Sequence, residues 1–417
     1  KYESKYKIEP YASGGEIMVS HDELFLLILH ENKIQIIDAE RNKLCYSLEA
    51  DESDLTSFCT HQNIVFTASI NQLIRVWDWK ERVITHHWKT GHKKPITGLA
   101  HSQLLQLVAS VSSEGIKLYS LEKKFHTHTL KISHCLFNSI IFHEGTHVFL
   151  IAATTDNCVR IFDPKSAKIH LELKEHTGQV FQLVICEDHI YTLGRDKTIA
   201  VYCTPNFVLK TSMIFFEDVD CFLVVPSDTF PPLGSVATDI VCTFGVLGCL
   251  KLWTYLPTSC IFSINIFSLG SHSDKILQRS MIKYALLMKS KGLIAFSTHL
   301  GELIYFDVKS LSISKHVVSN LSQVFQLEMM GNFLIVVSDS ERVRVLDPDS
   351  QNCTQVLTGH KDTVLCLDFN GRLLVTGSKD DTIRCWELDE KSIFRCTCVG
   401  VGHIAPVSSV STSTNSS

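Results

Sequence analysis

The sequence has no long hydrophobic run, no excess of positive charge and no compact cysteine framework. Its longest apolar runs, such as Val148–Ala153, are far too short to span a bilayer, and the first residues, KYESKYKIEP, lack the apolar core of a signal peptide. The formal net charge is -5, so no global cationic field holds a polyanion. The 15 cysteines are scattered and odd in number, unlike those of a secreted disulfide scaffold. These features predict a soluble intracellular protein with reduced cysteines.

Long helical periodicity is also missing, and a short alternating segment recurs in its place. Its alternation of apolar and polar residues favours a half-buried strand. The copies are Ile34–Ile37, Ile74–Trp77, Ile116–Tyr119, Val159–Phe162, Ile199–Tyr202, Leu250–Trp253, Leu303–Phe306, Val343–Leu346 and Ile383–Trp386. The steps between their final residues are 40, 42, 43, 40, 51, 53, 40 and 40. A period near forty, with Asp after an aromatic residue as at Trp77 and Phe162, is typical of WD40 repeats. We therefore predict an all-β WD40 β-propeller with four strands per blade.

Residues 357–389 carry the clearest copy of the repeat. A Gly-His pair near its start and an Asp before its last strand predict a buried hydrogen-bonded network, because a histidine inside a sheet needs polar partners. The expected networks comprise His360, Thr376 or Ser378, Asp380 and Trp386 in this copy, and His176, Thr192, Asp196 and Tyr202 in a second. Aromatic residues such as Trp77 and Trp253 are expected to pack between neighbouring blades. We predict that all of these residues stabilise the fold and do not bind a ligand.

Other copies have lost parts of this network. Asn71 provides an amide where the acid should be, the copy with Glu114 is one residue short, and the turn in Gly245–Leu250 has no acid. Such degeneracy is common in WD40 repeats and argues against a ligand site at each His or Asp.

The nine copies predict more than one unit in the chain, because seven blades is the commonest closed ring for this fold. The predicted units are a seven-bladed ring at residues 1–320, the first two blades of an incomplete second propeller at 321–400, and the start of a further repeat with a polar tail at 401–417. The ring would end in an outer strand within Leu311–Asn320 and close through a strand around Lys7–Tyr11, which removes exposed edges. Two long steps place insertions at Asp228–Ser235 and Phe267–Lys275. We expect the chain to be part of a longer tandem-propeller protein.

Candidate metal and catalytic residues have simpler explanations. Cys396 and Cys398 are a close pair without the second pair that a zinc site needs. His126, His128 and His134 lie on an alternating stretch without a carboxylate or Cys partner, so solvated strand residues explain them better. No Gly-x-Ser-x-Gly, phosphate-cradling Gly-rich loop or His-Glu-x-x-His is present. We predict no catalytic residue, no metal and no cofactor.

The most basic local feature lies in Lys123–Lys131, with further lysines at 89, 93 and 94 before it. The candidate contacts to RNA or to a partner are Lys93, Lys94, Lys123, Lys124 and Lys131. If the two groups adjoin, they can contact phosphates. The alternative is a solvated sheet edge protected by lysines.

Several short stretches carry a closer resemblance. They are Lys7–Pro10 followed by Gly14-Gly15, Ser47–Glu49 leading into Asp54–Thr56, Thr67–Ser69, His87–Lys89, Phe216–Val219 leading to Pro226, Leu357–His360 with Val364–Asp368, and Gly402-His403 with Val407. In order and spacing along essentially the whole chain, the sequence resembles the transducin beta-like protein 3 family of U3 small nucleolar RNA-associated WD-repeat proteins. Lys-Ile-Glu-Pro before a Gly-Gly turn is the more specific element, since blade motifs alone occur in many propellers.

The resemblance implies tandem seven-bladed propellers, a helical C-terminal domain, and membership of a WD-repeat subcomplex of the small-subunit processome. That nucleolar particle contains U3 RNA and assembles and cleaves pre-18S ribosomal RNA. The implied partners are other WD40 proteins and the U3 and pre-rRNA particle, with no membrane and no small-molecule substrate. The implied function is a non-catalytic scaffold. For such a scaffold we expect docking through the upper loops near Asn71, Glu114, Asp156 and Asp196.

The alternative is a WD40 adaptor for signalling or for ubiquitin-ligase substrate recognition. It needs a central pocket lined with arginines for an acidic or phosphorylated peptide. Arg75, Arg160, Arg342, Arg344 and Arg384 alternate out of strands and do not cluster in loops, which weakens this alternative. A propeller hydrolase would need a central metal or a convergent acid pair.

Overall fold

The computed structural model shows an all-β chain. It describes residues 16–40, 43–49, 53–132, 135–226, 239–245, 248–265, 282–298, 302–318, 324–331, 333–347, 353–371, 373–389 and 392–412. These residues form nine four-stranded antiparallel sheets, here called blades 1 to 9 in chain order. Within the described ranges, no helix is long and apolar enough to cross a bilayer.

Each blade runs from an inner strand to an outer strand in sequence order. The inner strands are β1 (Ile17–Val19), β5 (Leu55–His61), β9 (Ile96–Ser102), β13 (Phe137–Glu144), β17 (Val180–Cys186), β21 (Val219–Val225), β25 (Ile282–Met288), β29 (Val324–Met330) and β33 (Val364–Asn370). The second strands are β2 (Phe25–His30), β6 (Ile64–Ser69), β10 (Leu107–Ser112), β14 (Val148–Thr154), β18 (His189–Gly194), β22 (Ile240–Gly245), β26 (Leu293–Thr298), β30 (Phe333–Ser338) and β34 (Leu373–Ser378).

The third and outer strands complete the blades. The third strands are β3 (Lys33–Asp38), β7 (Leu73–Asp78), β11 (Gly115–Ser120), β15 (Val159–Asp163), β19 (Thr198–Cys203), β23 (Cys249–Tyr255), β27 (Glu302–Asp307), β31 (Val343–Leu346) and β35 (Ile383–Leu388). The outer strands are β4 (Lys43–Glu49), β8 (Val83–Lys89), β12 (Phe125–Leu130), β16 (Lys168–Leu173), β20 (Val208–Ile214), β24 (Thr258–Asn265), β28 (Ser312–Val318), β32 (Cys353–Leu357) and β36 (Phe394–Gly400). The all-β fold with four-stranded blades is as predicted.

Burial along each blade explains the residue types of its strands. A second strand lies between two neighbouring blades, so both of its faces are covered, and all six residues of β10 are buried. A near-continuous apolar run such as Leu107–Val111 suits that position. An outer strand lies at the rim, and six of the seven residues of β8 are exposed. The core therefore follows the inner three strands of each blade.

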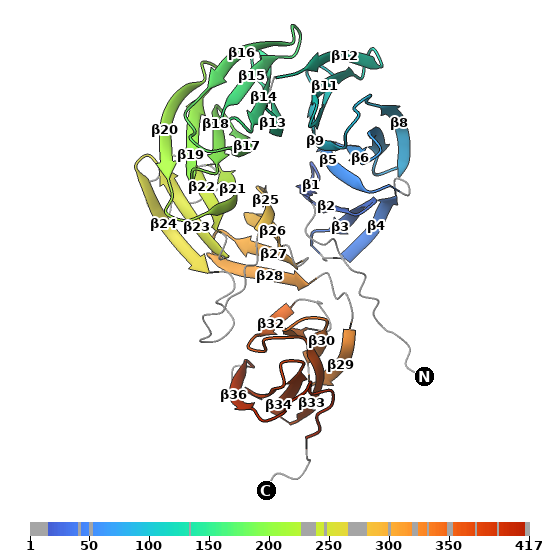
Figure 1. Cartoon of the computed structure of the whole chain (residues 1–417), viewed down its shortest axis with the longest axis vertical. Helices are drawn as coiled ribbons and strands as arrows, with labels where there is room; N and C mark the ends of the chain where they lie inside the picture. The colour runs from blue at the N-terminus through green and yellow to red at the C-terminus, as the bar shows by residue number, and fades with distance from the viewer. Residues whose placement is uncertain are drawn as a thin grey trace.

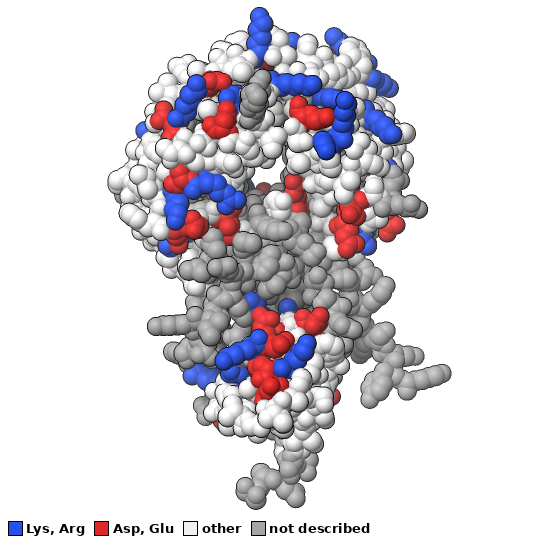
Figure 2. Space-filling view, in the orientation of Figure 1, with Lys and Arg blue, Asp and Glu red and all other residues white. Residues whose placement is uncertain are grey.

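Blades 1 to 7 surround a central axis, and blades 8 and 9 lie beside β28 as a separate pair (Figure 1). Blade 1 packs on blade 7, where Leu26 and Ile28 share an apolar cluster with Tyr305. The backbone N–H of Ser290 donates to the Glu23 carboxylate across this contact at 2.9 Å. The first and seventh blades are therefore neighbours, and Figure 2 shows an opening on the axis between the blades. The turns between second and third strands lie at one end of the blades, here called the upper face.

Side chains on the inner strands bridge adjacent blades. Gln182 of blade 5 donates its amide N–H to the carbonyl of Phe222 at 2.9 Å and accepts the backbone N–H of the same residue at 3.0 Å. Gln326 of blade 8 makes the same pair of bonds to Leu367 of blade 9, at 2.9 and 3.0 Å. Each glutamine thereby acts as an additional peptide group between two inner strands.

The last described segment lies against blade 9. The backbone N–H of Val407 donates to the carbonyl of Ser378 at 3.0 Å, as that of Val364 does to Ser340 at 3.0 Å one blade earlier. The Thr412 hydroxyl and backbone N–H both donate to the Asp368 carboxylate. The segment therefore occupies the place of a following inner strand.

Of the predictions about the ends of the units and the insertions, one can be compared with the structure. The outer strand expected within Leu311–Asn320 corresponds to β28. The strand expected at Lys7–Tyr11 and the insertions at Asp228–Ser235 and Phe267–Lys275 lie outside the described residues. The division of the chain at residues 320 and 400 stays a prediction.

Candidate functional site

Blade 9 holds a chain of hydrogen bonds that runs from an indole to a carboxylate. Trp386 Nε1–H donates to Thr376 Oγ1 at 3.0 Å, and Thr376 Oγ1 lies 2.8 Å from His360 Nε2. The other ring nitrogen of His360, Nδ1, lies 3.0 Å from Asp380 Oδ2. Asp380 also accepts the backbone N–H of Lys361 at 2.8 Å. The network therefore ties β34 and β35 to the loop before β33 and to the turn between β34 and β35.

Burial and hydrogen bonding fix the protonation of this network. Burial lowers the pKa of His360, so its ring is neutral at neutral pH. A neutral ring here donates Nδ1–H to Asp380 and accepts the Thr376 hydroxyl at Nε2. Burial alone would raise the pKa of Asp380, but hydrogen bonds from Thr382, Lys361 and His360 outweigh it and lower that pKa to about 2. The carboxylate is therefore a permanent acceptor for the turn.

Blade 5 repeats this arrangement with a tyrosine in place of the indole. His176 Nε2 lies 2.7 Å from Thr192 Oγ1, and Nδ1 lies 3.1 Å from the Asp196 carboxylate. Tyr202 is buried in the position of the indole. In blade 9, the alternative partner Ser378 donates its hydroxyl to a backbone carbonyl of the preceding loop at 2.9 Å, and Thr376 takes the histidine.

The other two predicted indoles keep one bond of the network. Trp77 Nε1–H donates to Thr67 Oγ1 at 3.0 Å, and Trp253 Nε1–H donates to Thr243 Oγ1 at 2.9 Å. In both blades the threonine lies on the neighbouring second strand. A buried indole donor needs such an acceptor, which explains why the bond remains where the rest of the network is lost.

The second residue of each repeated third-strand segment is a cation in several blades. Arg160 of blade 4 donates to the Asp156 carboxylate at 2.5 Å and to Glu172 at 2.8 Å. The Arg160 hydrogen bonds lower the pKa of Asp156 to about 2. Lys251 of blade 6 lies 2.8 Å from Glu217, which reaches it from the preceding loop. In these two blades a carboxylate neutralises the cation.

Blade 3 departs from this pattern. Lys117 occupies the same register position, but within the described residues its ammonium group forms no ion pair and donates to the carbonyl of Thr90 at 3.2 Å. The blade's histidine, His92, bonds two serines, with Nδ1 2.8 Å from Ser112 Oγ and Nε2 3.0 Å from Ser110 Oγ. Burial, followed by the charge of Lys117, lowers the pKa of His92 to about 4. The ring is therefore neutral, and the cation is not neutralised.

These departures accompany a cavity of about 270 Å³ on the upper face, here called the blade 3 cavity. It is lined by Gly91, His92, Lys93, Glu114, Gly115, Lys117, Thr129 and Lys131. Glu114 accepts the backbone N–H of Lys93 at 2.8 Å, and this bond lowers the pKa of Glu114, so the carboxylate is ionised at neutral pH. The cavity thus joins the β8–β9 loop, the β10–β11 turn and the end of β12.

Two glycines give the lysines access to this cavity. A Cβ added at Gly91 would lie 3.2 Å from Lys117 Nζ, and one at Gly115 would lie 3.2 Å from Lys131 Cγ and 2.4 Å from the carbonyl oxygen of Leu130. Gly115 also has a φ of +136°, which a side chain rarely adopts. Any larger residue at these positions would displace a lysine or the backbone.

The five lysines predicted as contacts divide between two faces. Lys93 and Lys94 lie in the β8–β9 loop and Lys131 follows β12, all at the upper face. Lys123 and Lys124 precede β12, at the other end of a strand of six residues, which spans about 20 Å. Figure 2 shows blue side chains gathered over the part of the ring that holds β11 and β12. The contact of these lysines with RNA or a partner stays a prediction.

Lys117 was not among the residues predicted from the sequence, although it completes the cavity with Lys93 and Lys131. A signal was available, since Lys117 shares its register position with Arg160 and Lys251. The charge at that position, in a blade whose copy of the repeat is one residue short, marks it.

The other candidate residues do not assemble into a site. His126 Nε2 lies 3.0 Å from Thr129 Oγ1, His128 is half-buried on β12, and His134 lies outside the described residues. Cys396 and Cys398 are exposed free thiols on β36. Across the described ranges, no group of three or more His, Cys, Asp or Glu side chains is placed to hold a metal ion.

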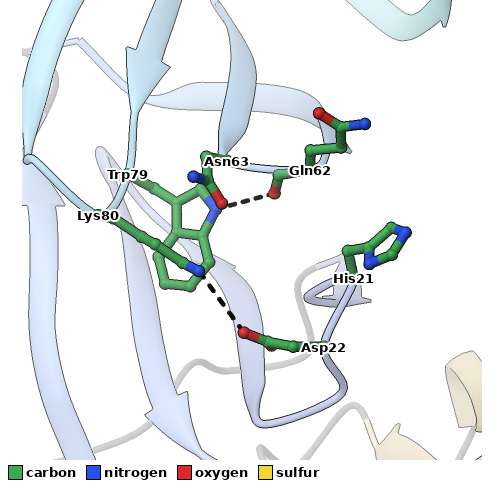
Figure 3. A pocket seen from close by; sticks show the side chains of 6 residues that line it. All are labelled: His21, Asp22, Gln62, Asn63, Trp79 and Lys80. Atoms are coloured by element: carbon green, nitrogen blue, oxygen red, sulfur yellow. Dashed lines mark hydrogen bonds and ion pairs between the residues drawn. The ribbon is translucent and has the colours of Figure 1, made fainter.

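A smaller cavity of about 170 Å³ lies at the lower face between blades 1 and 2 (Figure 3). It is lined by His21, Asp22, Gln62, Asn63, Trp79 and Lys80. The indole N–H of Trp79 donates to the Gln62 carbonyl at 3.1 Å, and Lys80 Nζ lies 3.6 Å from Asp22. Because its donor and its charges already have partners, this cavity offers less to a ligand than the blade 3 cavity.

Comparisons with known proteins agree with the repeat and the geometry. The family model "WD domain, G-beta repeat" matches residues 351–387, which span β32 to most of β35. The β-propeller domain of Myceliophteria thermophila Cps50 (Swd1) matches with a TM-score of 0.59 at 13% identity, covering 72% of this chain and 98% of that one. The chain has the WD40 β-propeller fold. The predicted fold class is confirmed, while the number of blades in a closed ring stays a prediction.

This WD40 propeller chain also has curated relatives along nearly all of its length. It is 25% identical over 422 residues to transducin beta-like protein 3 of Mus musculus, and 25% identical over 424 residues to that of Bos taurus. Each comparison covers 98% of this chain and 52% of the relative. The chain therefore spans about half the length of these relatives. The resemblance found in the sequence is confirmed.

Proposed function

We propose that this chain is a non-catalytic WD40 scaffold of the small-subunit processome, acting in pre-rRNA processing and small-subunit assembly in the nucleolus. The observation that carries the proposal is the similarity to transducin beta-like protein 3 over 98% of the chain. For that family, the resemblance implies other WD40 proteins and the U3 and pre-rRNA particle as partners. No catalytic group and no small-molecule substrate enter this function.

The proposed mechanism is docking on pre-formed surfaces. The networks around His176 and His360 fix the turns at Asp196 and Asp380 before any partner arrives, because each carboxylate is hydrogen-bonded to the loop before its blade. A turn that is already ordered loses little conformational entropy on binding. The turns of successive blades all open on the upper face, so a single partner can contact several of them at once.

The adaptor alternative receives no support from the arginines that it needs. Arg75, Arg160, Arg342 and Arg344 are buried, so their guanidinium groups are not presented to a peptide at the ring centre. Arg384 is half-buried on β35 of blade 9, outside the seven blades around the axis. Arg160 is further occupied by Asp156 and Glu172. The scaffold function is therefore preferred over an adaptor with an arginine-lined central pocket.

Affinity purification tests the proposal. The protein is tagged in cells, purified at moderate salt, and its eluate is probed for U3 small nucleolar RNA and for co-purifying WD-repeat proteins, with an unrelated tagged propeller as the control. We expect strong enrichment of both over the control. Recovery of a ligase or signalling partner without U3 RNA would overturn the processome assignment and leave only the propeller fold.

A further inference from the structure

We propose that the blade 3 cavity binds the phosphate group of a phosphorylated serine or threonine side chain in a partner protein. The inference goes beyond the scaffold function, because it names a recognition chemistry that does not depend on the particle that the chain joins. It rests on the charge, the shape and the lining of the cavity.

The charge of the cavity matches a phosphomonoester. Lys93, Lys117 and Lys131 bring three ammonium groups, and Glu114 brings one carboxylate, so the lining carries a net charge of +2. His92 adds nothing, because its ring is neutral. A phosphorylated side chain carries a charge of about -1.5 to -2 at pH 7. Lysine binds phosphate as a point charge with three donors, so three lysines from separate segments can surround one phosphate.

Lys117 differs from its counterparts in blades 4 and 6. Arg160 and Lys251 stand at the same register position, and each is neutralised by a carboxylate at hydrogen-bond distance. Lys117 forms no ion pair in the described part of the chain, and its ammonium donates only to a backbone carbonyl. The Glu114 carboxylate, which could have neutralised it, instead accepts the N–H of Lys93. A cation that forms no ion pair inside a concave site with a net positive charge is a binding position for an external anion.

The size and lining of the cavity favour a phosphate on a short stem. A volume of about 270 Å³ is many times what a single water needs, which leaves room for a phosphate and its remaining hydration. A phosphotyrosine ring would need apolar walls, and the lining consists of Lys, Glu, Gly, Thr and one His. Thr129 and the loop backbone supply neutral hydrogen-bonding groups beside the lysines. These features select phosphoserine or phosphothreonine.

The same features disfavour the RNA backbone as the ligand. Single-stranded RNA sites combine a basic groove with rings on which bases stack. The ring of His92 is buried with both nitrogens bonded to serines, so it is not available for stacking. Lys123 and Lys124 lie at the other end of β12, so the lysines do not form one continuous track. A phosphodiester also carries only one charge, against the net charge of +2.

Fluorescence anisotropy on the 417-residue chain tests this site. The probes are labelled degenerate peptide libraries with a central phosphoserine or phosphothreonine, and the same libraries without phosphate. We expect the phosphorylated libraries to bind at least tenfold more tightly. The double variant Lys117→Gln/Lys131→Gln should lose at least tenfold of that affinity, and Lys93→Gln should lose about threefold. Binding should also weaken from pH 7 to pH 5, because the phosphate loses its second charge near pH 6.

The chain offers a matched control in Lys123→Gln/Lys124→Gln, which removes the same two charges from the opposite end of β12. We expect it to change the affinity by less than twofold, with both double variants melting at the wild-type temperature. Equal binding of phosphorylated and unphosphorylated libraries, no binding of either, or equal losses in the two double variants would each overturn the proposal. A single-stranded RNA with a 5′-hydroxyl that binds more tightly than the peptides, and needs Lys117 and Lys131, would reassign the cavity to RNA.

Discussion

In blades 9 and 3, the same positions of the repeat have different roles. In blade 9, the Asp380 carboxylate is hydrogen-bonded to the buried His360 and to the backbone N–H of Lys361 in the loop before the blade, so this acid has a structural role. In blade 3, His92 is satisfied by two serine hydroxyls, and Glu114 reaches only a loop N–H. Both histidines are neutral and both blades are complete sheets. The difference teaches that a blade can lose the bond between its histidine and its acid, keep its fold, and carry a lysine without an ion pair at its surface.

The largest expected effect is a difference in stability between variants of Asp380 in blade 9 and of Glu114 in blade 3. Replacing Asp380 by Ala leaves the His360 N–H and the N–H of Lys361 without their acceptor, which should cost about 3 kcal/mol of unfolding free energy. Replacing Glu114 by Ala exposes only one N–H to water, so its effect should be much smaller. Melting temperatures followed by circular dichroism measure both. An unchanged melting temperature for Asp380→Ala would refute the folding role of the network, and Asp380→Asn serves as the conservative control.

The second comparison concerns the cation on the third strand. Arg160→Gln removes the guanidinium from Asp156 and leaves Glu172 paired with Lys174, and it should cost about 2 kcal/mol, less than breaking a fully buried pair because both acids are partly exposed. Lys117→Gln breaks no ion pair and should change stability by less than about 0.5 kcal/mol. Urea denaturation of the two variants measures the difference. If Lys117→Gln is as costly as Arg160→Gln, Lys117 has a structural role and the contrast between the blades fails.

The third comparison lies on the inner strands, where blade 1 has an acid at the place of a bridging glutamine. Glu16 accepts the backbone N–H of Phe58 at 3.0 Å, as Gln182 accepts that of Phe222. Burial raises the pKa of Glu16 to about 7, against the opposing hydrogen bonds from Phe58 and Ser57. A charged carboxylate cannot donate to the facing carbonyl as the glutamine amide does.

This acid makes the blade 1 contact sensitive to pH. The folded chain holds the Glu16 proton more tightly than the unfolded chain, so unfolding free energy should fall between about pH 4.5 and pH 7, by at most about 1.4 kcal/mol per pH unit, and level off above. Glu16→Gln should therefore be more stable than wild type at pH 8 by about 1.5 kcal/mol, with the gap closing at pH 5. Urea denaturation at the two pH values tests this. A gap that is the same at both would show that Glu16 does not titrate in this range.

Much of the fold follows from the period of the repeat. Each alternating segment lies within a third strand of the structure, because alternation with a period of two is read directly as a half-covered strand. The pairing of histidine and acid was also predictable, since His176 and Asp196 are separated by the same 20 residues as His360 and Asp380. Equal spacing in equal blades places the side chains alike.

The blade 3 cavity was not predictable in the same way. It depends on a loop, a turn and a strand end that meet only in three dimensions, and on the φ of +136° at Gly115. The acid that neutralises Lys251 is Glu217, which lies in a different loop and carries no repeat signal. The separation of Lys124 from Lys131, in contrast, could have been predicted, since a strand of six residues between them puts them on opposite faces.

The bridging glutamines have a consequence for how the blades open. Because Gln182 holds both backbone groups of Phe222, the amide of that residue can exchange its hydrogen only when blade 5 releases its neighbour. The same holds for Leu367 and blade 8. The amide hydrogens of blades 5 and 6, and those of blades 8 and 9, should therefore exchange with solvent as cooperative pairs. The free energy of opening each pair is then set by contacts between neighbouring blades, as in a one-dimensional array of repeats. One side chain on β17 and one on β29 thus transmit the stability of one blade to the next.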